Sequence, residues 1–458
     1  MKPKAMAKVK TSGPVATCQP VQSIPDKFHT RHTTCHCGGK LLKHHSGVTA
    51  KCYDLVGVKD VTIITYRCSR KNQGCGVAHS ANFYFEKDMG NKINTVNADD
   101  LKGMAVLFTS NKRCFTLRML EYHSNLAFRG FLSASAVDWS YKATFGDQDQ
   151  QPVQHAGQHG ANIQHDFRKE LTTAIVYYLA IRELSAIGME KQITVGDEIT
   201  ADVYEKLNKH YHEHVLKPVN SGAIDLVVGD GNAKVLTRCG ADTQAKKKES
   251  MKRTGRPRKH KKAKPSNMSH GWYMMVVPTG QIVQISQMLD PEDHEIVTHA
   301  LESTVERFPN LNCFVYDRAC AYAPKNKTRA AFKKIKHWCV DKFHARRHNK
   351  RCKCSPRNVP SIRRRLRGVN TVCAEQAFSW FRGYARTLND MNEYRHKFLV
   401  LVFTRMHNEA VKKGDTAHLN AYAPLQSLSM KRSRPYACTK AKPKACTKVK
   451  KRMMKAKK

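Results

Sequence analysis

The chain has 458 residues, of which 41% are hydrophobic, and a formal net charge of +43. The apolar content, with 17 Phe and 16 Tyr, excludes a wholly disordered protein, and the length predicts about three packed domains. The charge indicates a polyanionic partner, for which nucleic acid is the economical explanation. No apolar run approaches the roughly 20 residues that cross a bilayer, so we expect no membrane partner.

The N-terminus has no apolar segment after its first charges, so we expect a chain that stays in the cytosol or nucleus. Cysteines remain mostly reduced there, so clusters among the 16 Cys indicate metal ligands before disulfides. Lysine and arginine concentrate in three runs, at residues 1–10, 245–264 and 429–458. We predict basic disordered tails at 1–30 and 416–458 and a basic insertion at 241–268.

The first ordered unit is predicted at residues 31–90, as a small cysteine-cluster domain. Two pairs of cysteines flank the β-branched stretch VTIITYRC, which indicates a β-hairpin between two turns. Tetrahedral zinc takes four soft ligands from two such turns. The candidate zinc ligands are Cys35, Cys37, Cys68 and Cys75. Because the spacings within the pairs are irregular, three substitutes are kept: His36, Cys52 and His79. Buried free thiols are the alternative.

Residues 91–220 are predicted to be mainly helical, because ELTTAIVYYLAIREL places apolar residues at helical spacing. From residue 221 the pattern is typical of strands, in AIDLVVGDG, GWYMMVVP, GQIVQIS and LNCFVYDRA. After residue 370 a helical stripe returns in AEQAFSWFRGYARTL. We therefore predict an α/β unit over residues 221–415.

The basic insertion contains TGRPRKHKK, whose Gly-Arg-Pro core is similar to an AT-hook. Such a core runs extended along the minor groove of A·T-rich DNA, with Arg256 in the groove and Lys259 on phosphate. A solvated loop or a nuclear-import signal is an interpretation of at least equal weight. Both interpretations place the chain with DNA in a nucleus.

Asp230 and Asp317 each end a predicted strand, in AIDLVVGD and LNCFVYD. Acids at the ends of strands in one sheet approach closely enough to share divalent cations. A third carboxylate is expected from a helix packed on the sheet, and Glu375 is the candidate. Their separations leave room for the elements of a ribonuclease H-like fold. Carboxylates so placed hold two Mg²⁺ or Mn²⁺ ions, one activating water or a 3′-hydroxyl and the other stabilising the leaving oxygen of a phosphodiester.

Each acid also has a plainer interpretation. Asp-Gly and Gly-Asn are common turn dipeptides, so Asp230 on its own is typical of a turn. Glu375 on its own is a favourable charge in the first turn of a helix. Alternation along the first strand places Asp225 on the face opposite Asp230, which leaves Asp225 as a surface acid.

The segment HWCVDKFHARRHNKRCKCSP lies between the second and third acids. His344 and His348 are four residues apart and would share one face of a helix. With Cys352 and Cys354 they form a candidate second zinc site. A basic, DNA-facing surface without metal is an alternative of equal weight.

Four motifs in this order, VVGDGNAKV, VYDRACAY, DKFHARRHNKRCKC and AEQAFSWF, resemble those of the KDZ (Kyakuja-Dileera-Zisupton) group of DDE transposases. The N-terminal unit resembles the cysteine-cluster domains that accompany them. The segment from Asp341 to His344 is similar to the Cys/Asp-x-x-His signature of the wider hAT-like transposases. The family's motifs match Asp230, Asp317, His344 with His348 and Cys352, and Glu375 with Trp380.

The resemblance implies a ribonuclease H-like α/β core, a mixed sheet flanked by helices, with an N-terminal zinc-ribbon-like domain and a helical linker domain. It implies nuclear cut-and-paste transposition, in which Mg²⁺-dependent hydrolysis at element ends precedes attack of the 3′-hydroxyl on double-stranded target DNA. Asp230, Asp317 and Glu375 would hold the metals, and His344 would position a scissile phosphate or flanking strand.

Two alternatives to a transposase remain open. One is a catalytically inactive, transposase-derived nuclear DNA-binding protein, and the other is a zinc-stabilised scaffold or RNA-binding protein. The sequence leaves the oligomeric state open, a homo-oligomer included.

Overall fold

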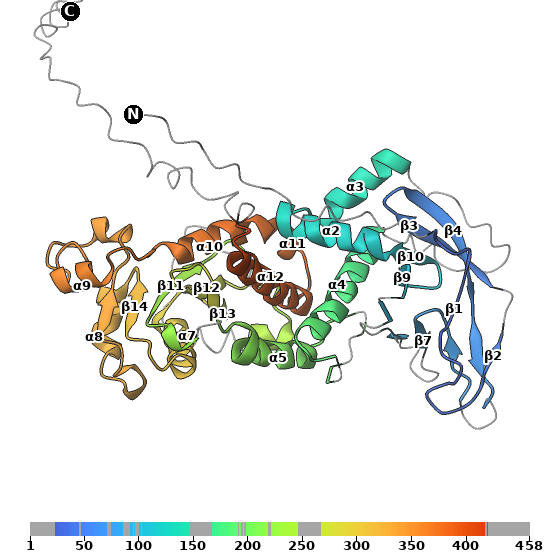
Figure 1. Ribbon diagram of the computed structural model, residues 1–458, viewed down its shortest axis with the longest axis horizontal. Coiled ribbons are helices and arrows are strands. Elements are labelled where there is room, and N and C mark those ends of the chain that lie inside the picture. Colours follow the sequence, from blue (N-terminus) through green and yellow to red (C-terminus); the bar gives the residue numbers. More distant parts are fainter. Residues whose placement is uncertain are drawn as a thin grey trace, which may run out of the picture.

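The structure, a computed structural model, describes most of the chain between residues 23 and 419. The described residues are 23–44, 47–70, 75–85, 92–94, 96, 100–101, 103–146, 167–190, 192–193, 196, 198–218, 221–245, 267–416 and 419. They form an elongated body with β-sheets at the N-terminal end, helices in the middle and a further sheet with its own helices at the other end (Figure 1). The predicted α/β class is confirmed.

The N-terminal unit contains two five-stranded sheets, in the orders β1-β4-β3-β10-β9 and β2-β5-β6-β7-β8. Strands β3 and β4 form the hairpin that lies between the two cysteine pairs. The strands of this unit are Lys27–His29 (β1), Leu41–Lys43 (β2), Val48–Asp54 (β3), Gly57–Ile64 (β4), Tyr66–Cys68 (β5), Ala78–His79 (β6), Phe83–Phe85 (β7), Lys92–Asn94 (β8), Val106–Phe108 (β9) and Arg113–Thr116 (β10).

Two boundaries differ from the sequence prediction. Strand β1 lies inside the predicted N-terminal tail of 1–30, where it pairs in parallel with β4. Strands β9 and β10 lie inside the predicted helical region of 91–220, and β10 pairs with β3 so that Cys114 lies opposite Cys52. These strands have three or four residues each, so they are too short to show the two-residue alternation of a strand in the sequence. They are defined by their pairing with strands that are distant in the chain.

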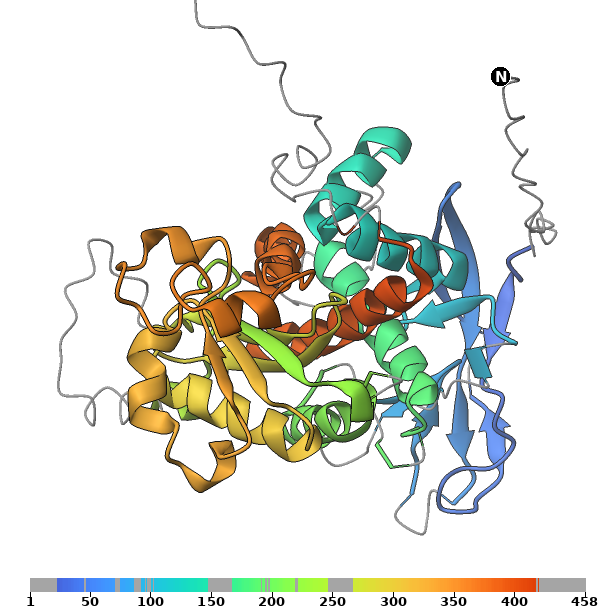
Figure 2. The same ribbon diagram turned by 60° about the vertical axis from the view of Figure 1, so that its left-hand side comes forward.

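The middle layer consists of helices. Its elements are Leu117–Gly130 (α2), Ala134–Phe145 (α3), Phe167–Ala186 (α4), Ala201–His210 (α5), the π-helix Tyr211–Val215 (η2) and the 3₁₀ turn Ser221–Ala223 (η3). Thr116, Ser133 and Thr200 begin three of the helices, because each side chain accepts a backbone N–H of the first turn. Helix α4 carries buried residues on most of its surface and contacts α2, α3 and β9, so it is the centre of this layer (Figure 2).

The second unit is built on a sheet with the strand order β13-β12-β11-β14-β15. Strands β11, β12 and β13 form an antiparallel meander, whereas β14 and β15 run parallel to β11. A helix, α7 (His294–Arg307), connects β13 to β14. The strands are Leu226–Asn232 (β11), Gly271–Val276 (β12), Ile282–Met288 (β13), Cys313–Tyr316 (β14) and His337–Cys339 (β15).

Side chains alternate between the two faces of this sheet. Leu226 and Val228 join the apolar core shared with the C-terminal helices, whereas Val227 joins the core beneath α7. The remaining elements are Ala319–Asn326 (α8), Ala330–Phe332 (η4), His344–Arg347 (η5), Pro360–Arg365 (α9), Cys373–Phe381 (α10), Arg382–Tyr384 (η6), Ala385–Leu388 (α11) and Glu393–Lys413 (α12). Helix α10 packs across β11 and β12.

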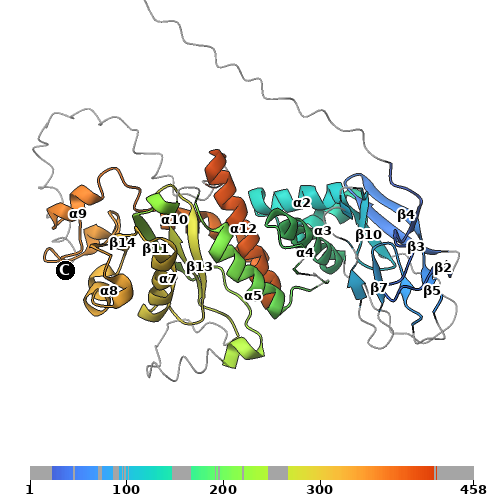
Figure 3. The same cartoon turned by 60° about the horizontal axis from the view of Figure 1, so that its bottom comes forward.

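Helices α5 and α12 lie between the second sheet and helices α2–α4 (Figure 3). One apolar core runs through this junction. The Tyr384 hydroxyl donates to the Phe128 carbonyl at 2.6 Å, and the Arg405 guanidinium on α12 donates twice to the buried Glu183 carboxylate on α4, at 2.6 Å each. Among the described helices, none combines the length and the apolar character that a bilayer crossing requires.

Candidate functional site

Three aspartates lie at the carboxyl ends of the parallel strands in the second unit. The pairing of β11 with β14 matches Gly229 with Tyr316, and one residue further it places Asp230 beside Asp317. The pairing of β14 with β15 matches Val315 with Cys339, and two residues further it places Asp317 beside Asp341. Paired strands are about 4.8 Å apart, so the three aspartates form a row at one edge of the sheet.

The alternation along each strand decides which face these aspartates share. Val228 and Val315 belong to the core beneath α10 and α12, and Asp230 and Asp317 follow each of them by two residues. Both aspartates therefore face the side of the sheet on which α10 packs. Asp225, as the alternation predicts, is a surface residue whose carboxylate pairs with Arg365 at 2.7 Å.

Two glycines beside Asp230 allow close approach by neighbouring side chains. A Cβ added to Gly229 would lie 2.2 Å from the Tyr273 hydroxyl oxygen, and one added to Gly231 would lie 2.3 Å from Glu292 Oε2. The backbone N–H of Gly231 also donates to Asp230 Oδ1 at 2.8 Å. The two glycines thus admit a tyrosine and a glutamate on the face of β11 opposite Asp230.

Burial and like charges shift the acidity of this site. Burial, followed by the charges of Glu375 and Glu292, raises the pKa of Asp230 to about 9. Burial also raises the pKa of Asp317, although the nearby His344 opposes the shift. In the part of the chain that the structure describes, Asp317 Oδ1 is buried without a hydrogen-bond partner. A bound cation would neutralise such carboxylates and offset the free-energy cost of burying their charge.

Glu375 approaches the two aspartates from α10. It stands in the first turn of this helix, is about half exposed, and its charge contributes to the raised pKa of Asp230. The helix packs on β11 and β12 through its apolar stripe, which includes Ala377, Phe378 and Trp380. The structure thus brings Asp230, Asp317 and Glu375 to one edge of one sheet.

Glu292 is a fourth acid of this site, and the sequence patterns did not identify it. It precedes the N-cap of α7, Asp293, and its carboxylate lies against Gly231. Burial raises the pKa of Glu292. The residue lies in the turn MLDPEDHE, where no periodicity marks it.

His344 completes this group of side chains. Its Nδ1 lies 2.6 Å from Oδ2 of the buried Asp341, and its Nε2 lies 3.9 Å from Glu375 Oε1. The other oxygen of Asp341 accepts the backbone N–H groups of Phe343 and His344, at 2.7 and 2.9 Å. Asp341 therefore fixes the orientation of the imidazole, and the Phe343 side chain beside it is exposed.

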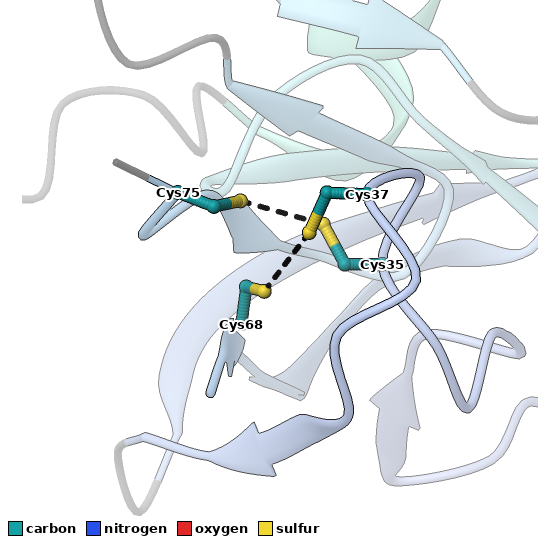
Figure 4. A group of neighbouring side chains, drawn as sticks. All are labelled: Cys35, Cys37, Cys68 and Cys75. Carbon is teal, nitrogen blue, oxygen red and sulfur yellow. Dashed lines mark hydrogen bonds between the residues drawn. The ribbon is translucent and has the colours of Figure 1, made fainter. Parts of the chain in front are cut away.

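The four cysteines predicted as zinc ligands lie together in the N-terminal unit (Figure 4). Cys35 Sγ is 3.8 Å from Cys75 Sγ, and Cys37 Sγ is 3.4 Å from Cys68 Sγ. Tetrahedral zinc with Zn–S bonds of about 2.3 Å separates its sulfur ligands by about 3.8 Å. A hydrogen bond from the Gly39 backbone lowers the pKa of Cys37 to about 7, which favours the thiolate that binds metal. The cluster could therefore bind a metal such as zinc.

Two of the three substitute ligands also lie at this cluster. His79 Nε2 is 3.3 Å and His36 Nδ1 is 3.5 Å from Cys35 Sγ. Burial lowers the pKa of His79 to about 4, so its imidazole is neutral at physiological pH. Cys52 is separate from the cluster, because it is buried opposite Cys114 in the neighbouring sheet.

A second group of soft ligands lies beside the acids, with a membership that differs from the predicted one. The Sγ atoms of Cys320 and Cys352 lie 3.5 and 3.6 Å from His348 Nδ1. Among the predicted ligands, His344 pairs with Asp341 instead, and Cys354 is buried next to the group. Cys320 stands in the first turn of α8, far from the segment that suggested the site, although it follows Asp317 by only three residues.

The segment between Asp341 and Glu375 carries many exposed basic side chains, which are called the basic face below. No acidic residue occurs between Asp341 and Glu375 in the sequence. The basic face consists of the exposed side chains Lys342, Arg346, Arg347, Lys350, Arg351, Lys353, Arg357, Arg363, Arg364 and Arg367. The residues predicted to bind DNA from the insertion, Arg256 and Lys259, lie outside the described residues.

In the part of the chain that the structure describes, ligand atoms suited to a metal gather at two places. The groups of three or more ligand atoms that all lie within 4.8 Å of one another are made of cysteine and histidine, and the acids do not form such a group among the residues described. Carboxylate oxygens suit hard divalent cations, whereas thiolates and imidazoles suit zinc. Comparison of the chain with family models, with curated proteins and with solved structures gave no match.

Proposed function

We propose that this protein is a DDE-type DNA transposase, or a protein derived from one, that hydrolyses phosphodiester bonds and transfers DNA strands. The observation that carries the proposal is the position of Asp230 and Asp317 on adjacent parallel strands, with Glu375 on a helix packed over the same face. Carboxylates that come from neighbouring elements on one face can share divalent cations.

The proposal includes a ribonuclease H-like fold for the second unit. An antiparallel meander, a crossover helix and two strands parallel to the first support it, with the order β13-β12-β11-β14-β15. The proposal also keeps the resemblance to the KDZ group and a nuclear location, which rest on the sequence motifs alone.

The residues fit Mg²⁺ or Mn²⁺ at the acidic site. Asp230, Asp317 and Glu375 would hold these ions, and the unpartnered Oδ1 of Asp317 offers a free acceptor. When bound, the ions supply a nucleophile at neutral pH and stabilise the charge on the leaving oxygen. Glu292 lies against Gly231 and adds negative charge that would favour cation binding.

The remaining side chains would bind and orient DNA. His344, held by Asp341, presents Nε2 toward Glu375 and would position the scissile phosphate or a flanking strand. The basic face would meet neighbouring phosphates. Phe343, which is 53% exposed, offers an aromatic surface on which an unpaired base can stack.

The rival is a non-catalytic DNA-binding protein that retains the acids without using them. Burial of acids whose charges repel one another favours the enzyme, because this arrangement costs stability and gains only when cations bind. The function of a zinc-stabilised scaffold or of an RNA-binding protein would not require the buried acids.

Nicking of supercoiled plasmid in Mg²⁺ tests the proposal. The wild-type protein and Asp225→Asn should nick equally, since Asp225 lies on the opposite face and in an exposed ion pair. Asp317→Asn should lose at least about 100-fold in rate. Equal nicking by Asp317→Asn and Asp225→Asn, or none by the wild type on any DNA substrate, would leave the DNA-binding rival as the better account.

A further inference from the structure

We propose that Cys320, His348 and Cys352, with Cys354 as the fourth ligand, bind a zinc ion that ties the segment after Asp317 to the segment after His344. This inference goes beyond the proposed function. It concerns metal content, and it would stand even if the protein cut no DNA.

The distances among the three closest ligands fit tetrahedral zinc. Zn–S bonds of about 2.3 Å and Zn–N bonds of about 2.0 Å at tetrahedral angles place sulfur and nitrogen ligands about 3.5 Å apart. The observed separations from His348 Nδ1 are 3.5 Å to Cys320 Sγ and 3.6 Å to Cys352 Sγ. All three ligand atoms lie within 4.8 Å of one another.

The ligands come from three short segments that the fold holds firmly. Cys320 stands in the first turn of α8, and His348 directly follows the 3₁₀ turn η5. Cys352 closes a turn in which its backbone N–H donates to the Asn349 carbonyl at 2.9 Å. These turns converge because β14 and β15 are parallel neighbours, so the segments that follow them leave the sheet at the same edge.

Cys354 is the proposed fourth ligand, and its Sγ is not among the atoms that lie within 4.8 Å of one another. It lies two residues beyond Cys352, is buried, and its carbonyl accepts the Val340 backbone N–H at 2.8 Å, which anchors it beside β15. A Cys₃His set is a common composition of structural zinc sites.

Charge balance also favours an ion at this position. Zinc with three thiolates and a neutral imidazole carries a net charge of about −1. Lys350, Arg351 and Lys353 are exposed sequence neighbours of the ligands, and their positive charges would offset the net charge of such a site. Other buried cysteine pairs of the chain, such as Cys313 and Cys339, have no histidine at ligand distance among the described residues.

The position of the zinc would give it a structural role beside the acids. Asp317 precedes Cys320 by three residues, and His344 precedes His348 by four. An ion that joins Cys320 to His348 therefore fixes the spacing between the aspartate and the histidine that flank the candidate site. Zinc would act here as a rigid link and would contact no substrate.

Zinc content of the full chain, purified under reducing conditions, tests the proposal by elemental analysis. The wild type should contain two zinc ions, one at the four N-terminal cysteines and one here. Cys352→Ser and His348→Ala should each contain one, whereas His348→Cys should keep two. Cys239→Ser is the matched control, because Cys239 is a buried cysteine outside both groups, and it should also keep two.

A second comparison keeps the test decisive if a single variant folds poorly. Cys68→Ser should remove the N-terminal zinc and leave one ion, and adding Cys352→Ser should leave none. A zinc content that Cys352→Ser leaves unchanged, or an oxidised Cys320–Cys352 pair in place of the metal, would overturn the proposal. None of these outcomes depends on nicking, so failure of this site and failure of the transposase account are distinguishable.

Discussion

The Nδ1 atom of His344 lies 2.6 Å from the Oδ2 atom of Asp341, and this pair joins the row of aspartates at the sheet edge to Glu375 on α10. Asp341 is buried and also accepts two backbone N–H groups of the η5 turn. The carboxylate thereby selects the tautomer in which Nδ1 carries the proton and Nε2 faces Glu375.

Replacement of Asp341 by Asn should weaken the proposed cleavage. An amide can hold the imidazole in the wrong tautomer, so we expect a fall of about 100-fold in nicking rate with little change in DNA affinity at fixed salt. Nicking rates and filter binding, measured side by side, check this. If DNA affinity falls as much as the rate, Asp341 acts on folding or binding and has no positioning role.

The ion pair between α4 and α12 should dominate the stability of the junction. Glu183 is 1% exposed and accepts two hydrogen bonds from Arg405, and the Tyr211 hydroxyl also contacts it. Glu183→Gln should lower the free energy of unfolding by about 3 kcal/mol, because it leaves the largely buried guanidinium with only the half-exposed Glu409 as an ionic partner. Urea denaturation measures the difference.

A matched exposed pair provides the control for Glu183. Asp202 and Lys206 on α5 form an i,i+4 pair at 2.8 Å in which both side chains are more than half exposed, so Asp202→Asn should change stability by about 0.5 kcal/mol or less. Replacing Glu183 and Arg405 together with Leu should cost less than Glu183→Gln alone. A double variant that is less stable than the single one would contradict this explanation.

The buried His396 should make stability depend on pH. Burial lowers its pKa from 6.5 to about 4, its Nε2 accepts from Trp272 Nε1 at 3.2 Å, and its Nδ1 donates to the Leu388 carbonyl at 2.9 Å. In the unfolded chain His396 is protonated below about pH 6.5, whereas in the folded protein it is protonated only below about pH 4. The stability that the neutral His396 contributes is therefore fully present above pH 6.5. It is lost as the pH falls toward 4, and the free energy of unfolding decreases by about 3 kcal/mol in all.

The variant His396→Gln isolates this effect. Its midpoint of thermal unfolding should fall less steeply than that of the wild type between pH 6.5 and 4, since one titrating group has been removed. Differential scanning calorimetry at several pH values gives both slopes. Identical slopes would show that His396 is protonated in the folded protein as readily as in the unfolded chain.

The sequence predicted the acids of the candidate site because their signal is local. Asp230 and Asp317 each follow an apolar strand, and Glu375 begins an amphipathic helix. The same period that identified the strands placed Asp225 on the opposite face, where it forms a surface ion pair. A periodic pattern that locates a strand or a helix in the sequence also locates the residues at its ends.

Other parts of the site depend on tertiary structure and left no such signal. Glu292 lies in a turn without periodicity, and its side chain packs against β11 because Gly231 leaves room for it. Cys320 joins His348 because two parallel strands place their following turns together. For the same reason the short strands β1, β9 and β10 escaped prediction, since each is defined by pairing with residues distant in sequence.

Binding of Mn²⁺ to the zinc-loaded protein, followed by electron paramagnetic resonance, tests the central claim that the acids hold divalent cations. The wild type and Asp225→Asn should bind Mn²⁺ saturably, with an affinity that rises with pH, because Asp230 has a pKa of about 9 and must lose its proton to bind metal. Asp230→Asn should weaken this binding at least about tenfold. Equal binding by Asp230→Asn and Asp225→Asn, or an affinity that does not change between pH 6.5 and 8.5, would contradict the account.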